Sequence, residues 1–476
     1  MSVEQAKEVK VKVTGGANAR HPVSVTTSLS IGAFPSFNLC YPPGNKEAIT
    51  SAMDMTSKEI FKRLQRSQEN TFKTKEEKIK IRLKGPEGYG KLTFKGSVSC
   101  PIYTFNSSGL YASETIMARY ASLNAVDLSI YKISNNYFSV GNPASKKANV
   151  SKLNKAILAI FTYLVDEAET EKPTEPTMKK SVEFTKKVNN DQKQYIKKLF
   201  ENSKNMGWDG LYKKIGTSAW DSLKSRIITI LQSNTGGFLN VILQLAEEFQ
   251  CVYVPGSNGE DPGQLVNKLK LEENTRPIHL KPIGIHAALG SRGMYPPGTV
   301  TLVSPQFKKN YFKNNPPDRL YYVYPEDASK DLGSTIQIPG PPWLSGDSYA
   351  LIQPVKDGEN KKKKGQSFSK KRVKQQTAED KVDKKTKDIK EIIEQWAKAS
   401  YWWQVLGQTG CTLTCEFGNY EVGKTYVVYN AKGQRLFTGL LYSVMHNISA
   451  SEGTSMAQSI LNFSHVRMGT AKIPGL

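Results

Sequence analysis

The sequence predicts a mainly β protein with added helices, an α+β fold in which two β-barrel domains are joined by a helical insertion. Three observations lead to this prediction. Apolar and polar residues alternate over much of the first 140 residues, apolar residues recur at helical spacing between about 150 and 250, and alternation returns after residue 410. Alternation is typical of half-buried strands, whereas the i, i+3, i+4 spacing is typical of amphipathic helices.

Residues 1–140 are predicted to form the first β-barrel domain. Short alternating segments separated by turn residues are typical of small barrels and sandwiches. One helix is expected among them at 48–69, because its apolar residues stand near helical spacing. The strands are expected at 9–13, 23–31, 79–83 and 92–98.

Residues 141–250 are predicted to form the helical insertion. Leu153, Ile157, Ile160 and Phe161 recur at the spacing that places them on one face of a helix. A Pro/Glu/Thr/Lys-rich linker is expected at 166–180. Further helices are expected at 187–206, 210–232 and 238–249, and the last of them leads into a strand at 251–255.

The C-terminal half is predicted to supply the second barrel. Residues 251–355 form a β-rich domain that contributes to it, with strands at 299–303 and 320–324, and residues 389–476 add a helix near 389–404 and the closing strands. Residues 356–388 form a basic low-complexity loop. Its few apolar side chains cannot offset about 1–2 kcal/mol of backbone entropy per residue, so we expect it to be peripheral and dispensable for folding. The closing strands are expected at 411–417, 425–430, 435–445 and 457–467.

One hairpin pattern occurs twice. Residues 82–96 read as a strand, a glycine turn and a strand that contains Phe94 followed by x-Gly, and residues 426–439 have the same order of parts around Phe437. Such self-similarity is typical of duplicated units. It predicts two related barrels with Phe94 and Phe437 at equivalent core positions.

Length and composition exclude several classes of protein. With 476 residues, of which 38% are hydrophobic and 10% aromatic, the chain can build sizeable cores and is not disordered as a whole. The N-terminus lacks a secretory pattern, and the longest mainly apolar run, 156–165, is too short to cross a bilayer of roughly 30 Å. Five scattered cysteines indicate folding in a reducing cytoplasm.

The net charge of +23 leaves a second function open, that of a basic nucleic-acid-binding structural protein. Residues 356–390 carry 14 Lys or Arg and 6 Asp or Glu, and the remaining charge is spread along the chain. Only Phe368 is interleaved with the basic runs at 361–364 and 370–372, so little is available to stack on bases. A solvated loop is the preferred interpretation.

No candidate motif for catalysis or cofactor binding is complete. Residues 85–91 resemble a phosphate-binding loop, but Leu92 stands where a magnesium-binding Ser or Thr is needed and a strand follows, which favours a hairpin turn. Cys411 and Cys415 lie on one face of a strand without two further zinc ligands nearby, which favours core packing. Glu247 and Glu248 are helix neighbours and are expected on a solvated face.

The chain is therefore predicted to be non-enzymatic, with no catalytic, cofactor-binding or metal-binding residues and no cofactor. Its five histidines provide few candidate bases, and no Gly-x-Ser-x-Gly turn precedes a helix. A hydrolase that needs only two carboxylates stays an alternative. The aromatic run 401–403 is either an interface anchor or core filling.

Three stretches together resemble the baseplate hub proteins of contractile phage tails. The first is 28–39 with the later hairpin at 94–98, and the second is the helix-to-strand passage 239–255. The third holds the most landmarks. It comprises 417–423, the Val444-x-His446-x-Ile-Ser turn within 439–449, and a last strand ending at Arg467. The resemblance covers less than half of the chain.

The resemblance implies a tail-tube-like fold, shared with type VI secretion spikes and related injection systems. It implies a homotrimer in which each subunit carries two tube-like β-barrel domains, so that the ring adapts a sixfold tail tube to a threefold central spike. The implied partners are the tail tube protein, the spike and other baseplate proteins, with no membrane anchor and with genome DNA passing through the channel without specific binding. The implied location is the virion, after assembly in the host bacterial cytoplasm.

Overall fold

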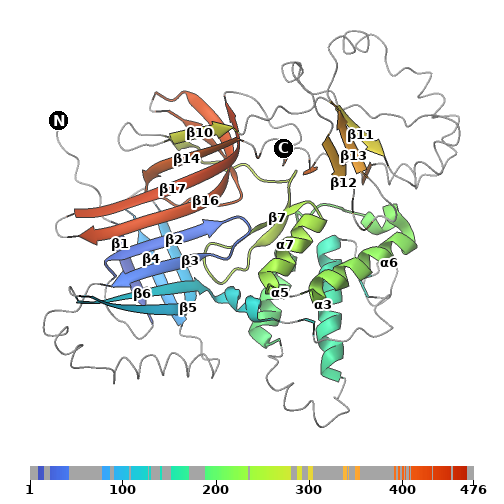
Figure 1. The fold of residues 1–476 in the computed structure, drawn as a ribbon, viewed down its shortest axis with the longest axis horizontal. Coiled ribbons are helices and arrows are strands. Elements are labelled where there is room, and N and C mark those ends of the chain that lie inside the picture. Colours follow the sequence, from blue (N-terminus) through green and yellow to red (C-terminus); the bar gives the residue numbers. More distant parts are fainter. Residues whose placement is uncertain are drawn as a thin grey trace.

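A computed structural model shows a mainly β chain with a group of helices beside the main sheet, which confirms the predicted fold class (Figure 1). None of the described helices is both long and apolar enough to span a membrane. The structure describes residues 9–15, 22–41, 78–85, 90–106, 109–126, 128–129, 140–141, 152–170, 188–233, 236–279, 287–291, 299–303, 336–339, 341, 343, 349–353, 391–392, 395–396, 399–400, 403, 407, 409–430, 432–451 and 454–468.

The first β unit consists of five antiparallel strands that lie in the spatial order β4-β5-β6-β3-β2. Alternation builds it, because every second residue of β4 is buried. A short strand, β1 (Lys10–Thr14), pairs with the outer edge of β4. The five strands are β2 (Ser24–Ser30), β3 (Ser36–Tyr41), β4 (Lys78–Lys84), β5 (Lys91–Asn106) and β6 (Gly109–Ala118).

The second β unit has five antiparallel strands in the spatial order β15-β16-β17-β14-β10. The two-residue strand β9 (Ile278–His279) pairs in parallel with β15. The five strands are β10 (Ala287–Ser291), β14 (Thr409–Glu416), β15 (Thr425–Tyr429), β16 (Arg435–Ser451) and β17 (Thr454–Met468).

The two units have the same connectivity. Taken in chain order, β2, β3, β4, β5 and β6 correspond to β10, β14, β15, β16 and β17, and the two spatial orders are then identical. The repeated hairpins also agree in register, because Phe94 lies opposite Ile81 as Phe437 lies opposite Val428. This agreement confirms the predicted equivalence of the two phenylalanines.

A shared irregularity strengthens the equivalence. The ladder between β5 and β6 shifts register between Val98 and Cys100. The ladder between β16 and β17 shifts between Leu441 and Ser443, and also between Thr438 and Leu440, at the point equivalent to the start of the β5–β6 ladder in the first unit. Counted from the phenylalanine of each hairpin, the shift after Val98 and the shift after Leu441 fall at the same position. Bulges re-aim a strand and are specific features of a fold, so their match indicates a repeated unit rather than two similar hairpins.

The ladder between β2 and β16 joins the two units edge to edge in one 12-stranded sheet within the described residues. Each unit keeps its own apolar core. Phe94 stacks on Phe37 in the first unit, with ring centroids 4.1 Å apart, and Phe437 contacts Phe463 edge-on in the second, at 5.5 Å. Closure of each unit into a separate tube-like barrel stays a prediction.

The helices pack against the core of the first unit and continue it. A capping box, in which Asn189 and Gln192 bond each other's backbone N–H, begins α5. Gly216, with φ +78°, kinks α6 in a conformation that glycine adopts readily. The helices are α3 (Leu153–Thr170), α5 (Asn190–Asn202), α6 (Leu211–Gln232) and α7 (Phe238–Glu248), with a 3₁₀ helix, η1 (Arg119–Ala125), after β6.

The structure corrects several expected boundaries. The helix α3 continues to Thr170, so no linker begins at residue 166. Strands β3 and β6 were not predicted, β5 and β16 run well beyond their expected ends, and β17 begins three residues before its expected start. The expected helix at 48–69, the strand at 320–324 and the loop at 356–388 lie outside the described residues. The predicted domain boundaries stay predictions.

Within residues 251–355, only β9 and β10 join the second unit among the described strands. The rest form two small sheets of their own. Strands β7 (Cys251–Val254) and β8 (Gln264–Asn267) pair beside α7, and β12 (Ile336–Pro339), β13 (Tyr349–Gln353) and β11 (Thr299–Val303) form a three-stranded sheet.

Candidate assembly site

The seam between the units is the antiparallel ladder of β2 with residues 443–449 of β16. At its centre Thr27 lies opposite His446, whose backbone N–H donates to Thr27 Oγ1 at 3.1 Å. His446 Nδ1 lies 2.8 Å from Ser459 Oγ of β17. All three side chains are buried, so the seam holds a small polar cluster that is hydrogen-bonded within the protein.

Burial lowers the pKa of His446 to about 4. Its ring lies 4.9 Å from that of Phe417, in surroundings that disfavour a positive charge. The imidazole is therefore neutral at pH 7 and contributes packing and one hydrogen bond to the seam.

The outer face of the seam exposes apolar surface. Tyr442 and Met445 of β16 are the large hydrophobic side chains that stand exposed among the described residues, at 41% and 37%. The Tyr442 carbonyl accepts from the Ile31 N–H at 2.9 Å, so the backbone here is fixed by the seam itself. Exposed apolar side chains on a rigid strand suit contact with another protein.

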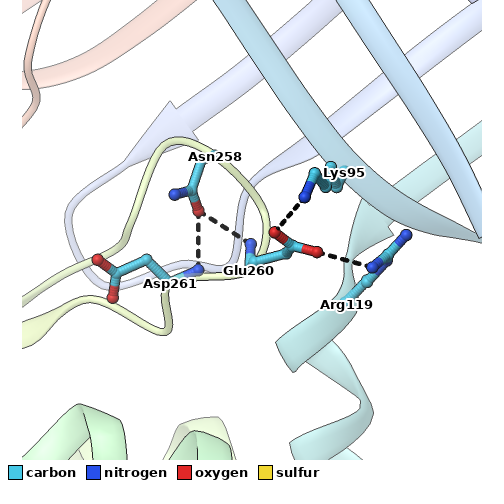
Figure 2. A network of polar contacts seen from close by, with 5 residues as sticks. All are labelled: Lys95, Arg119, Asn258, Glu260 and Asp261. Carbon is cyan, nitrogen blue, oxygen red and sulfur yellow. Dashed lines mark hydrogen bonds and ion pairs between the residues drawn. The ribbon is translucent and has the colours of Figure 1, made fainter.

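A loop after β7 fastens the first unit to the helices (Figure 2). We call residues 255–263 the clamp loop. Glu260 accepts from Lys95 of β5 at 2.6 Å and from Arg119 of η1 at 2.7 Å. These hydrogen bonds and charges, with Lys95 the largest cause, hold the pKa of Glu260 below its ordinary value. On the helical side, Asn202 of α5 donates to Asp261 at 2.9 Å.

The backbone of the clamp loop extends the sheet. Lys95 N–H donates to the Asn258 carbonyl and Arg119 N–H to the Gly259 carbonyl. Gly259 has φ +78°, and a Cβ there would lie 2.0 Å from the Lys95 carbonyl oxygen. Only glycine allows this approach. In the second unit the position equivalent to Lys95 is Thr438, which pairs with β17. In the first unit β6 does not extend as far as Lys95, and the clamp loop pairs with this residue in its place.

Replacing Glu260 with glutamine should lower the free energy of unfolding by about 1 kcal/mol. Both ion pairs are lost, and the gain from each is reduced by solvent because the side chains of Lys95 and Glu260 are about a third exposed. Urea denaturation followed by circular dichroism measures the change.

A matched control is Glu421→Gln, which removes the exposed i,i+3 ion pair with Lys424 at 2.7 Å. It should change stability by less than about 0.5 kcal/mol. If Glu260→Gln costs no more than this control, the two ion pairs of Glu260 add nothing measurable to the stability of the protein.

The structure shows where most of the candidate chemical motifs lie. Gly85 N–H donates to the Gly90 carbonyl, Lys84 pairs with Lys91, and the strand β5 follows where a phosphate-binding loop needs a helix. These flanks agree with the predicted hairpin; residues 86–89 of the loop lie outside the described residues. Cys411 is buried, and the Cys415 thiol lies 3.3 Å from the Tyr420 hydroxyl. Among the described residues, no group of three His, Cys, Asp or Glu side chains could hold a metal ion.

The expected solvated face for Glu247 and Glu248 is wrong for Glu248. That side chain is only 6% exposed and accepts from Arg226 at 3.0 Å. Burial raises its pKa, and Arg226 opposes the rise. Glu247 is 79% exposed in its side chain and lies 3.8 Å from Lys268. Helical spacing could have separated them, because Glu248 lies three residues after the buried Leu245 and seven after the buried Val241, on the apolar face of α7.

Aromatic side chains form clusters in the described part of the chain. Trp403, from the predicted aromatic run, contacts His465 with ring centroids 4.2 Å apart and lies beneath the Lys268 ammonium. This supports core filling for Trp403. A second cluster, which the sequence did not suggest, joins Trp208, Trp343 and Trp396, each within 6.3 Å of another ring.

No protein-family model matches the chain, and no curated protein matches it. Its structural neighbours are phage tail proteins and a type VI secretion component. A tail protein from Neisseria meningitidis is 9% identical, with a TM-score of 0.39, and the match covers 96% of each chain.

Two further solved structures are similar at the same level. A tail protein of prophage MuSo2 from Shewanella oneidensis is 9% identical, covers 96% of this chain and 98% of its own, and has a TM-score of 0.39. An Escherichia coli component of the type VI secretion system is 7% identical, covers 95% and 76%, and has a TM-score of 0.35.

Proposed function

We propose that this chain is a structural subunit of a phage tail baseplate hub, and that three copies form a ring between the sixfold tail tube and the threefold central spike. The observation that carries the proposal is the repeated β unit. Two units of identical strand order in one chain let a threefold ring present six equivalent units to a sixfold partner.

The sequence supports the same role. Most of the landmarks that resemble hub proteins fall on β2, β3, the repeated hairpins, β16 and β17, which build the two units and their seam. The stretch 239–255 falls instead on α7 and β7. The exposed Tyr442 and Met445 at that seam offer an apolar contact for a neighbouring tail protein. No catalytic role is part of the proposal.

Light scattering on the purified chain should give three times the subunit mass of 53.0 kDa. Negative-stain microscopy should show rings with threefold symmetry. A chain that stays monomeric at all concentrations, or one whose main activity is salt-sensitive DNA binding, would contradict the proposal.

A further inference from the structure

The seam shows how two of these units bind each other. Within one chain, β2 of the first unit adds to β16 of the second, along residues 443–449 and beyond the end of β15. The internal repeat provides a second copy of both partners. The strand equivalent to β2 is β10, and the strand equivalent to β16 is β5.

The registers define the equivalence residue by residue. The matching bulges align β6 with β17. Because β3 pairs with β6 and β14 pairs with β17, these two ladders in turn align β3 with β14, and Phe37 corresponds to Cys411. Thr27 lies opposite Phe37, and Leu289 lies opposite Cys411. Leu289 of β10 therefore corresponds to Thr27 of β2.

The other half of the seam is matched in the same way. The bulge equivalence aligns Cys100 with Ser443, so residues 100–106 of β5 correspond to 443–449 of β16. The β4 ladder ends at Ser97, as the β15 ladder ends at Leu440. Beyond Ser97, no strand in the described part of the chain pairs with this edge of β5.

The strand β10 and the second half of β5 are therefore both sheet edges, and they cannot pair with each other within one copy of the chain. β10 ends the sheet, whereas β5 lies on the far side of the seam, and Figure 1 shows them at opposite ends of the main sheet. An edge that presents unpaired N–H and C=O groups is a template for another chain. A head-to-tail contact between two different edges closes into a ring when the rotation allows it.

We infer that β10 of one copy adds antiparallel to residues 101–105 of β5 in the next copy, repeating the internal seam between subunits. The inference rests on the proposed ring and names the contact that closes it. Transferring the seam register pairs Leu289 with Tyr103 and Ala288 with Thr104. Pro101, which has no N–H to donate, falls opposite Ser291 in the last pair, where it removes one donor from the ladder.

The seam also predicts which pairs are hydrogen-bonded. Ile31 N–H donates to the Tyr442 carbonyl, and the His446 N–H points at Thr27. Bonded pairs alternate with non-bonded ones in an antiparallel ladder, so the pair of Asn447 with Thr26 is non-bonded. Its counterpart between subunits is Thr104 with Ala288, where the Cα atoms are expected to lie about 4.5 Å apart, which a disulfide can bridge.

The test is the double variant Thr104→Cys with Ala288→Cys in the full chain, oxidised with copper phenanthroline and separated on a non-reducing gel. We expect reductant-sensitive dimers and a closed covalent trimer. The matched control, Thr104→Cys with Leu289→Cys, is one residue out of register and should give little cross-link. The unsubstituted chain, oxidised in parallel, shows what the native cysteines contribute.

A second variant keeps the inference testable if the cysteines disturb folding. Leu289→Pro removes a donor that points away from β14, so it should spare the fold of the subunit. It should raise the concentration needed for assembly about tenfold, the effect of about 1.4 kcal/mol per contact. Circular dichroism checks that the subunit still folds.

The outcomes separate this inference from the proposed function. Threefold rings without cross-linking of the 104/288 pair would overturn the strand contact and leave the hub proposal standing. A disulfide that forms only within single chains would also overturn it, and so would cross-linking that is equally strong in the out-of-register control. A chain that is monomeric under every condition would overturn both.

Discussion

Replacing Phe94 with alanine should lower the free energy of unfolding by about 3–5 kcal/mol, the usual cost of removing a fully buried phenylalanine ring. The side chain is 0% exposed and stacks on Phe37 at 4.1 Å, so the cavity left behind is lined by apolar atoms that cannot all collapse into it. Phe437 is 2% exposed and holds the equivalent place. Phe437→Ala should therefore cost a similar amount.

Urea denaturation of each variant measures the loss. Phe94→Leu and Phe437→Leu are the controls, because they keep most of the apolar volume and should cost less than the alanine variants. Since the two rings lie in separate cores, the effects of the alanine substitutions should add in the double variant. A cost below about 1 kcal/mol at either site would show that the site is not a core position.

Lowering the pH from 7 to 5 should destabilise the protein by about 2 kcal/mol for each of two buried histidines. Burial lowers the pKa of both His446 and His465 to about 4, and the nearby positive charges of Lys268 and Arg467 add to the effect at His465. In the unfolded chain both should titrate near 6.5. Between these values the unfolded state binds more protons, so the free energy of unfolding falls as the pH falls.

The loss should begin as the pH drops below about 6.5 and be complete near 4, the folded pKa. Denaturation midpoints in urea at several pH values measure it. Glutamine at both positions stays neutral, so the double variant His446→Gln with His465→Gln should lose most of the slope between pH 7 and 5, whatever its stability at pH 7. An unchanged slope would show that other groups cause the pH dependence.

Features that depend on neighbouring residues in the chain could be predicted from the sequence. Alternation identified β4 and the start of β5, and the four-residue spacing of Leu153, Ile157 and Phe161 identified α3. The glycine turn between two alternating segments identified both hairpins and the equivalence of their phenylalanines. These signals are local, because a strand's faces and a helix's stripe are set by positions two to four residues apart.

The pairing of strands that are distant in the sequence could not be predicted. Thr27 and His446 are 419 residues apart, and alternation says which face of a strand is buried but not which strand lies beside it. The place of the clamp loop depends in the same way on packing between segments. The bulges that align the two units are likewise a property of paired backbones, so the seam, its repeat and the free edges became visible only once the ladders were known.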